Sequence, residues 1–120
     1  MNAMILCAGL GTRFKPVTET IPKSNIEFLT LPLFSYSLYF VNTHNIKNTV
    51  INTHHLYQKV EDAALNLKQN NSKISISEEL PKILGSGGAL KGAENLFNEN
   101  EIMVFNGDNI CLFKEKSILS

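Results

Sequence analysis

The sequence carries no excess charge of either sign, few cysteines and no long hydrophobic run. Lys plus Arg and Asp plus Glu number 11 each, so the chain lacks the basic field that nucleic-acid binding requires. No apolar run approaches the length of a membrane span, and the N-terminus lacks the charged start and long apolar core of a signal peptide. We therefore expect a cytoplasmic protein that binds neither nucleic acid nor a membrane.

The two cysteines, Cys7 and Cys111, both stand in apolar, strand-like surroundings. This setting favours buried free thiols in a reducing compartment over a disulfide or a metal-binding pair. The composition, with 43% hydrophobic and 18% charged residues, is ordinary for a globular protein. A chain of 120 residues forms one domain or less, and it can bury roughly two-thirds of its unfolded surface.

Strand-like and helix-like segments alternate along the chain, which is typical of a parallel sheet with right-handed crossovers. The loop from residue 9 to about residue 30 is long for a connection, and long loops in compact domains are usually functional. We expect a strand at each of 4–8, 48–53, 73–77 and 102–105, and a helix at each of 32–45, 56–67 and 86–97.

Ligands of such sheets bind beyond the carboxyl ends of the strands. In this chain the polar and glycine-rich residues follow the predicted strands. The expected loops of the site are 9–13, 54–55, 78–88 and 107–108. We predict that these four loops converge on one edge of the sheet. His54 and His55 are adjacent and poorly placed to chelate one metal, so a turn or helix-start role is expected for them.

The segment LCAGLGTRFKP (residues 6–16) ends an apolar run in a glycine-rich turn, and VTETIPK (17–23) follows it. Glycines let backbone N–H groups approach phosphate oxygens, while Arg13 and Lys23 add positive charge for the same anion. This is the chemistry of a nucleoside triphosphate site. It is not a Walker loop, because no Gly-Lys-Ser/Thr closes it, and Phe14 occupies the third glycine position of the dinucleotide fingerprint.

Two further motifs lie at predicted strand ends. EELPKILGSGGAL (78–90) places three glycines where a helix starts, which permits close approach of a flat ligand; a serine-capped helix start is the alternative. NGD (106–108) places a carboxylate beside a glycine turn, which suits Mg²⁺ held together with substrate phosphates; a plain Asx turn is the alternative.

The pattern from Leu6 to Lys23 resembles the signature of the sugar-1-phosphate nucleotidyltransferases. That motif is an apolar residue, then Ala-Ala-Gly-x-Gly-Thr-Arg, then Pro, Thr and Pro-Lys, and here Cys7 replaces the first alanine. The wider resemblance covers Met4 to about Asn109. It implies an α/β fold, a Rossmann-like three-layer α/β/α sandwich with a mainly parallel sheet. The segment 52–56 also looks like bacterial members that make nucleoside-diphosphate mannose or activate N-acetylmuramate phosphate, which points to nucleotide sugars for cell-envelope polysaccharide.

The chain departs from the family pattern in three places. Ser24 and Asn25 follow Pro22-Lys23, where the family usually has Pro and a large apolar residue, and Thr30-Leu31 stands where a turn glycine often precedes Pro32. The chain also ends at Ser120, whereas full members are longer and their later part supplies the sugar-phosphate pocket and a second metal-binding Asp. The resemblance therefore implies that residues 1–120 are the N-terminal, nucleotide-binding portion of a truncated domain.

The resemblance further implies a Mg²⁺-dependent reaction of a nucleoside triphosphate with a sugar 1-phosphate, giving a nucleotide sugar and pyrophosphate. The 120-residue chain alone is expected to be inactive and to form a homo-oligomer through its exposed sheet edge. The implied catalytic residues are Arg13 and Lys23, the metal ligand is Asp108, and the nucleotide-binding set is Ala8, Gly9, Gly11, Thr12, Arg13, Lys23, Glu79, Gly85 and Ser86.

Two alternatives stay open at this point. A non-catalytic nucleotide-binding or regulatory module keeps base recognition without turnover. A cytidylyltransferase that acts on a phosphorylated alcohol such as phosphocholine shares the first motif.

Overall fold

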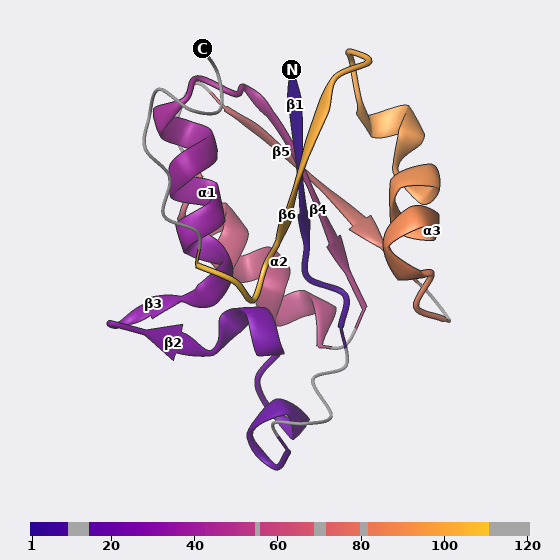
Figure 1. Ribbon diagram of the computed structural model, residues 1–120. Helices are drawn as coiled ribbons and strands as arrows, with labels where there is room; N and C mark the ends of the chain where they lie inside the picture. The colour runs from indigo at the N-terminus through magenta and orange to yellow at the C-terminus, as the bar shows by residue number, and fades with distance from the viewer. Residues whose placement is uncertain (10–14, 55, 69–71, 80–81, 111–120) are drawn as a thin grey trace.

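The central sheet is parallel and has the strand order β5-β4-β1-β6 (Figure 1). The computed structural model describes residues 1–9, 15–54, 56–68, 72–79 and 82–110. The two inner strands are almost wholly buried, as expected when helices cover both faces of a parallel sheet. The strands are β1 (Asn2–Leu6), β4 (Asn48–Thr53), β5 (Lys73–Glu78) and β6 (Ile102–Asn106).

Helices α1 (Leu33–Thr43) and α2 (Tyr57–Asn66) cover one face of this sheet, and α3 (Gly85–Gly92) covers the other (Figure 1). Alternate residues of β1 pack against the helices on opposite faces of the sheet, because successive side chains of a strand point to opposite faces. Ala3 and Ile5 pack with the α1 and α2 residues, whereas Met4 packs with Ala89 and Ala93. The predicted three-layer α/β/α arrangement is confirmed.

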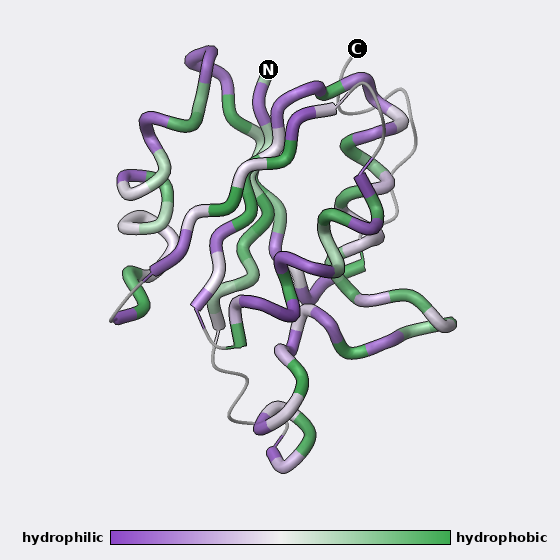
Figure 2. The backbone as a smooth tube through the Cα atoms, turned by 180° about the vertical axis from the view of Figure 1, so that it is seen from behind, coloured by the Kyte–Doolittle hydropathy of each residue, from purple (hydrophilic) through white to green (hydrophobic). Residues whose placement is uncertain are grey.

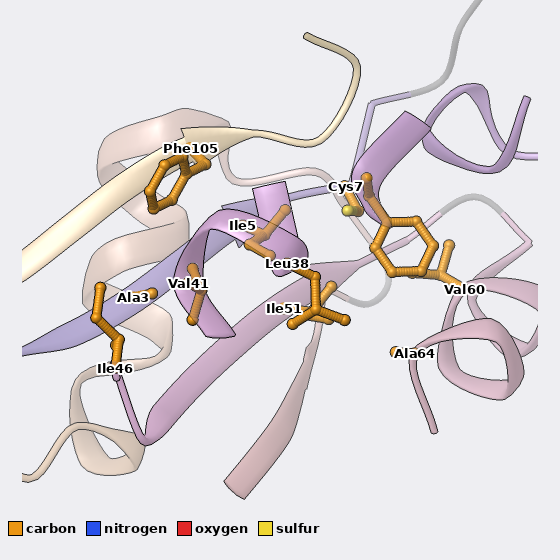
Figure 3. Close-up of a cluster of buried hydrophobic side chains, with 11 residues drawn as sticks. Ala3, Ile5, Cys7, Leu38, Val41, Ile46, Ile51, Val60, Ala64 and Phe105 are labelled. Carbon is orange, nitrogen blue, oxygen red and sulfur yellow. The ribbon is translucent and has the colours of Figure 1, made fainter. Parts of the chain in front are cut away.

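The larger core lies between the sheet and the pair α1 and α2. Its buried side chains point toward one another in the space between β1, β4 and the helices (Figure 3). The hydrophobic character of the central strands is visible in Figure 2, where they run between the two helical layers. The cluster comprises Ala3, Ile5, Cys7, Phe34, Leu38, Val41, Ile46, Ile51, Val60, Ala64 and Phe105.

The sequence predicts a long loop from residue 9 to about residue 30. The described part of this region, from 15 to 32, contains regular structure instead. It contains two short 3₁₀ helices, η2 (Val17–Glu19) and η3 (Lys23–Asn25), and a hairpin of β2 (Glu27–Phe28) and β3 (Leu31–Pro32). The hairpin turn places Leu29 and Thr30 at φ values of 51° and 71°. Tight hairpin turns of this kind normally use Asn or Gly, so their sequence signal is missing here.

Several element ends differ from the predicted ones. β1 begins and ends two residues earlier, because its pairing with β4 and β6 starts at the buried Asn2. This asparagine is tolerated in a strand because Asn48 Nδ2 donates to its Oδ1 at 2.7 Å and its own Nδ2 donates to Glu99 O at 2.9 Å. Pro32 precedes α1 at the N-cap instead of opening its first turn.

The third helix is shorter than predicted. α3 ends at Gly92 and a separate 3₁₀ turn, η4 (Glu94–Leu96), follows it. Glycine at the end of a helix favours termination over continuation. Every helix among the described residues is too short or too polar to span a bilayer.

Candidate functional site

A cavity of about 250 Å³ opens at the carboxyl ends of the parallel strands. Three of the four predicted loops contribute lining residues, namely those after β1, β5 and β6. The predicted loop 54–55 contributes none of the lining residues, and β4 contributes Asn52 from within the strand. Gly11, Thr12 and Arg13 lie outside the described residues, as does His55. The cavity is lined by Leu6, Cys7, Ala8, Gly9, Lys23, Ser24, Asn52, Glu79, Ile83, Gly85, Ser86, Asn106 and Asp108.

Lys23 and Asp108 form an ion pair in this cavity, with Nζ 2.5 Å from Oδ2. Each side chain is about one-third exposed, with relative accessibilities of 31% and 32%, so the pair is open to an incoming ligand. Lys23 comes from η3 and Asp108 from the turn after β6. The sequence predicted both residues as parts of one phosphate and metal site, and the structure places them in direct contact.

The position of Lys23 depends on how η3 is anchored. Within the turn, Asn25 N donates to Pro22 O at 2.9 Å and Ile26 N donates to Lys23 O at 3.2 Å. Asn25 Nδ2 also donates to Lys59 O of α2 at 2.9 Å. The 3₁₀ turn is therefore tied to the helical layer, and this connection directs Lys23 toward the strand ends.

Asp108 is positioned by the glycine that precedes it. Gly107 N donates to Leu6 O at 2.9 Å, which brings the turn after β6 against the end of β1. A Cβ atom at this position would lie 2.6 Å from Cys7 Sγ and 2.9 Å from Leu6 O. Only glycine fits there without a shift of the neighbours. Asn109 N also donates to Asn106 O at 3.3 Å, a backbone bond that closes a turn around Asp108.

Cys7 directly follows β1, lines the cavity and is a buried free thiol, as predicted. Cys111 lies outside the described residues. Burial raises the pKa of Cys7 to about 12; the Ser24 hydroxyl opposes this rise by stabilising the thiolate, and the negative charge of Asp108 adds to it. The side chain of Cys7 is consequently a neutral thiol at physiological pH.

A buried carboxylate joins three of the strand-end segments. Glu79 is 2% exposed, and its Oε1 accepts from Asn52 Nδ2 at 2.8 Å while its Oε2 accepts from Leu84 N at 3.0 Å. Asn52 Oδ1 in turn accepts from Cys7 N at 2.7 Å. This chain of bonds connects the ends of β1 and β4 to the loop before α3. That Glu79 contacts a base edge stays a prediction, since both of its oxygens already accept bonds within the protein.

The direction of each bond in this network is fixed, which allows a test of Glu79. Because Cys7 N occupies the amide oxygen of Asn52, the amide nitrogen must face Glu79. In Glu79→Gln, one of the two accepting oxygens becomes an NH₂ group. This donor then faces another donor, either Asn52 Nδ2 or Leu84 N. We expect a loss of about 2 kcal/mol in the free energy of unfolding, the cost of leaving one buried donor unbonded. Urea unfolding of the variant and wild type measures this.

The matched control for that experiment is Glu78→Gln. Glu78 is the exposed neighbour at the end of β5, so its neutralisation should change the free energy of unfolding by less than about 0.5 kcal/mol. Equal stabilities for the two variants would contradict the proposed direction of the bonds.

The glycine-rich block starts α3 by backbone conformation and not by a side-chain cap. Gly85 has φ +71°, and the N-cap residue Leu84 makes no side-chain capping bond. The serine-capped alternative is therefore wrong. A Cβ at Gly88 would lie 2.7 Å from Leu84 Cβ, so this glycine is needed for packing. Gly85 and Ser86 both line the cavity, where the sequence predicted them.

His54 follows β4 and its Nδ1 lies within hydrogen-bonding distance of the Glu79 carbonyl oxygen. This contact agrees with a role in the turn. Among the described residues, no group of three His, Cys, Asp or Glu side chains could hold a metal ion. That Asp108 binds Mg²⁺ stays a prediction.

Sequence reasoning missed the contributions of Asn52 and Ser24. Asn52 directly follows the apolar pair Val50-Ile51 in β4 and is 3% exposed, and a polar residue at this place in an inner strand is the signal that could have found it. Ser24 follows Lys23 directly and is also 3% exposed. Its only sequence signal is that it departs from the residue type usual after Pro-Lys.

The chain matches the family model described as nucleotidyl transferase over residues 2–120. The chain belongs to this family. It is 34% identical over 118 residues to a UTP–glucose-1-phosphate uridylyltransferase of Synechocystis, a match that covers 90% of this chain and 30% of that protein. It is also 34% identical over 112 residues to an N-acetylmuramate alpha-1-phosphate uridylyltransferase of Caulobacter vibrioides, covering 92% of this chain and 46% of that protein.

Solved structures agree with the fold of this nucleotidyl transferase chain. A UDP-glucose pyrophosphorylase complexed with UDP-glucose superposes with a TM-score of 0.79 at 23% identity, covering 95% of this chain and 48% of that one. HddC from Yersinia pseudotuberculosis, complexed with GMP-PN, has a TM-score of 0.75 at 27% identity and covers 89% and 47%. The predicted family and fold class are confirmed, and the chain spans less than half the length of each of these proteins.

Proposed function

We propose that this chain carries the nucleotide-binding part of an enzyme that transfers a nucleotidyl group from a nucleoside triphosphate to a sugar 1-phosphate. The observation that carries the proposal is the Lys23–Asp108 ion pair in a cavity at the strand ends. This pair supplies the two groups that a metal-bound triphosphate needs. The Lys23 ammonium pairs with phosphate oxygens, and the Asp108 carboxylate binds the metal.

Little covalent help is needed for this reaction, because the sugar-phosphate oxygen attacks the α-phosphorus in line. Positioning and charge neutralisation then carry the rate. Lys23 binds the α-phosphate and the attacking phosphate. Arg13 holds the β- and γ-phosphates and stabilises the leaving pyrophosphate, and the backbone of Gly9 to Gly11 contacts phosphate oxygens. Gly85 and Ser86 line the cavity at the start of α3. In this proposal they contact the nucleobase.

Mg²⁺ fits the donor set of this cavity. Mg²⁺ usually takes one or two carboxylates and completes its shell with water and substrate phosphates, so a single protein carboxylate is sufficient. Asp108 supplies this carboxylate, and it is partly exposed toward the cavity. When bound, the ion neutralises phosphate charge and orients the triphosphate.

The substrate class follows from the relatives. Both curated relatives described above are named for transfer to a sugar 1-phosphate, and others are named mannose-1-phosphate guanylyltransferase and heptose 1-phosphate guanylyltransferase. These names differ in base and in sugar, so they support the reaction type and not one substrate. Formation of a homo-oligomer through an exposed sheet edge stays a prediction.

The proposal is tested by titration calorimetry of the 120-residue chain with each of five triphosphates, with and without Mg²⁺. We expect weak binding of at least one triphosphate that strengthens when Mg²⁺ is present. In Asp108→Asn this strengthening should largely disappear while the melting temperature changes little, because the carboxylate is the protein's metal ligand. Identical Mg²⁺ dependence in both proteins would make Asp108 a turn residue only. Failure to bind any triphosphate would contradict the proposed site.

A further inference from the structure

Ser24 has a buried hydroxyl that the mechanism above does not use. The residue lines the cavity between Lys23 and Asn25 on η3, and it is 3% exposed. Its Oγ makes no hydrogen bond with any of the described residues. A hydroxyl that is buried without a partner is unfavourable, and each such group in a folded protein calls for an explanation.

The surroundings of Ser24 explain why its proton finds no acceptor. The side chain packs beside Cys7 and the turn after β6, with Ser24 Cβ 3.4 Å from the place that a Cβ of Gly107 would occupy. Cys7 could accept a strong hydrogen bond only as a thiolate. Cys7 is a buried free cysteine, and the sulfur of a thiol is a weak acceptor.

The neighbouring charges indicate which ligand group supplies the missing acceptor. Ser24 follows Lys23 in the chain and lines the same cavity, so an anion drawn to the lysine arrives next to the hydroxyl. A phosphate oxygen is such an acceptor, and hydrogen bonds from hydroxyls to charged oxygens are stronger than those to neutral ones. Rotation about χ1, for which a serine has three staggered positions, can turn the hydroxyl toward the cavity.

We propose that Ser24 is a phosphate-binding residue of this site, whose hydroxyl turns into the cavity and donates a hydrogen bond to a phosphate oxygen held by Lys23. The inference rests on the proposed function, since it assigns a further contact to the same triphosphate. It also gives a physical role to a position where this chain departs from the Pro usual in the family it resembles. A proline there has no side-chain donor to offer.

The test uses the 120-residue chain, Mg²⁺ and whichever of the five triphosphates binds the wild type best. Ser24→Ala should weaken binding by about tenfold, the effect of losing one hydrogen bond to a charged group. Ser37→Ala is the matched control. Ser37 is a buried serine of α1 that does not line the cavity, and its loss should leave the affinity within about twofold.

Thermal unfolding separates ligand binding from a structural role. Because Ser24 Oγ has no partner among the described residues, Ser24→Ala should melt at the same temperature as the wild type, or higher, in the absence of nucleotide. With nucleotide, its upward shift in melting temperature should be smaller than that of the wild type. A lower melting temperature without nucleotide would show that the hydroxyl already has a structural partner, and would overturn the proposal.

The result with Lys23→Ala distinguishes failure of this inference from failure of the proposed function. If Lys23→Ala abolishes binding while Ser24→Ala binds like the wild type, the triphosphate site stands and the role of Ser24 is wrong. If the wild type binds no triphosphate, both the site and the role of Ser24 are wrong.

Discussion

Replacing Lys23 by alanine is expected to lower the rate of nucleotidyl transfer by about a hundred- to thousand-fold, the usual effect of removing one preorganised charged donor. Lys23 lines the cavity and is directed into it by η3, which is anchored to α2 through Asn25. The measurement is pyrophosphate release, at saturating sugar 1-phosphate, by a longer form of the protein that turns over. In the 120-residue chain, the same substitution should remove most of the triphosphate affinity.

Two further variants make this result specific. Lys23→Arg should not restore the rate, because a planar guanidinium reaches its partners differently from a compact ammonium. Lys91→Ala is the control: Lys91 lies on α3 and pairs with Glu94 at 2.6 Å on the exposed surface, away from the cavity. A loss of less than tenfold in Lys23→Ala would remove Lys23 from the phosphate contacts. Arg13→Ala, at the other predicted phosphate-binding position, should behave like Lys23→Ala.

The sequence predicted the strands well, because their apolar patterns are local. The strand 48–53 has the predicted bounds, and the Gly-Asp turn after β6 lies where it was expected. The β2–β3 hairpin could not be predicted. Its turn residues are Leu29 and Thr30, and neither signals the positive φ that they adopt. Local propensity fails where tertiary contacts impose the backbone conformation.

In the candidate site, too, the sequence predicted what a local motif encodes and missed what tertiary contacts determine. Motifs pointed to Lys23 and Asp108, but their 2.5 Å contact depends on the anchoring of η3 to α2 through Asn25 and on the turn after β6, and no motif displays this arrangement. The bond between Asn52 and Glu79 joins residues 27 positions apart. Buried polar networks of this kind arise from the parallel register of β4 and β5, and no short motif encodes them.

Gly107→Ala is expected to lower the free energy of unfolding by about 3 kcal/mol, toward the upper end of the usual effect of overpacking. The new methyl group meets Leu6 O at 2.9 Å, a backbone atom that cannot rotate away, and Cys7 Sγ at 2.6 Å. For a domain of this size, the loss corresponds to a melting temperature lower by roughly 10 °C. Thermal unfolding followed by circular dichroism measures it.

Gly87→Ala is the matched control for this substitution. Gly87 lies inside α3, and nothing stands within 4 Å of a Cβ placed there. Alanine at a helical position with free space should raise the free energy of unfolding by about 0.5–1 kcal/mol, so the two glycine variants move stability in opposite directions. If Gly107→Ala were as stable as the wild type, the close contact between the β6 turn and the end of β1 would be wrong. In a folded Gly107→Ala, the displaced turn should also weaken the Mg²⁺-dependent part of triphosphate binding, because Asp108 moves with it.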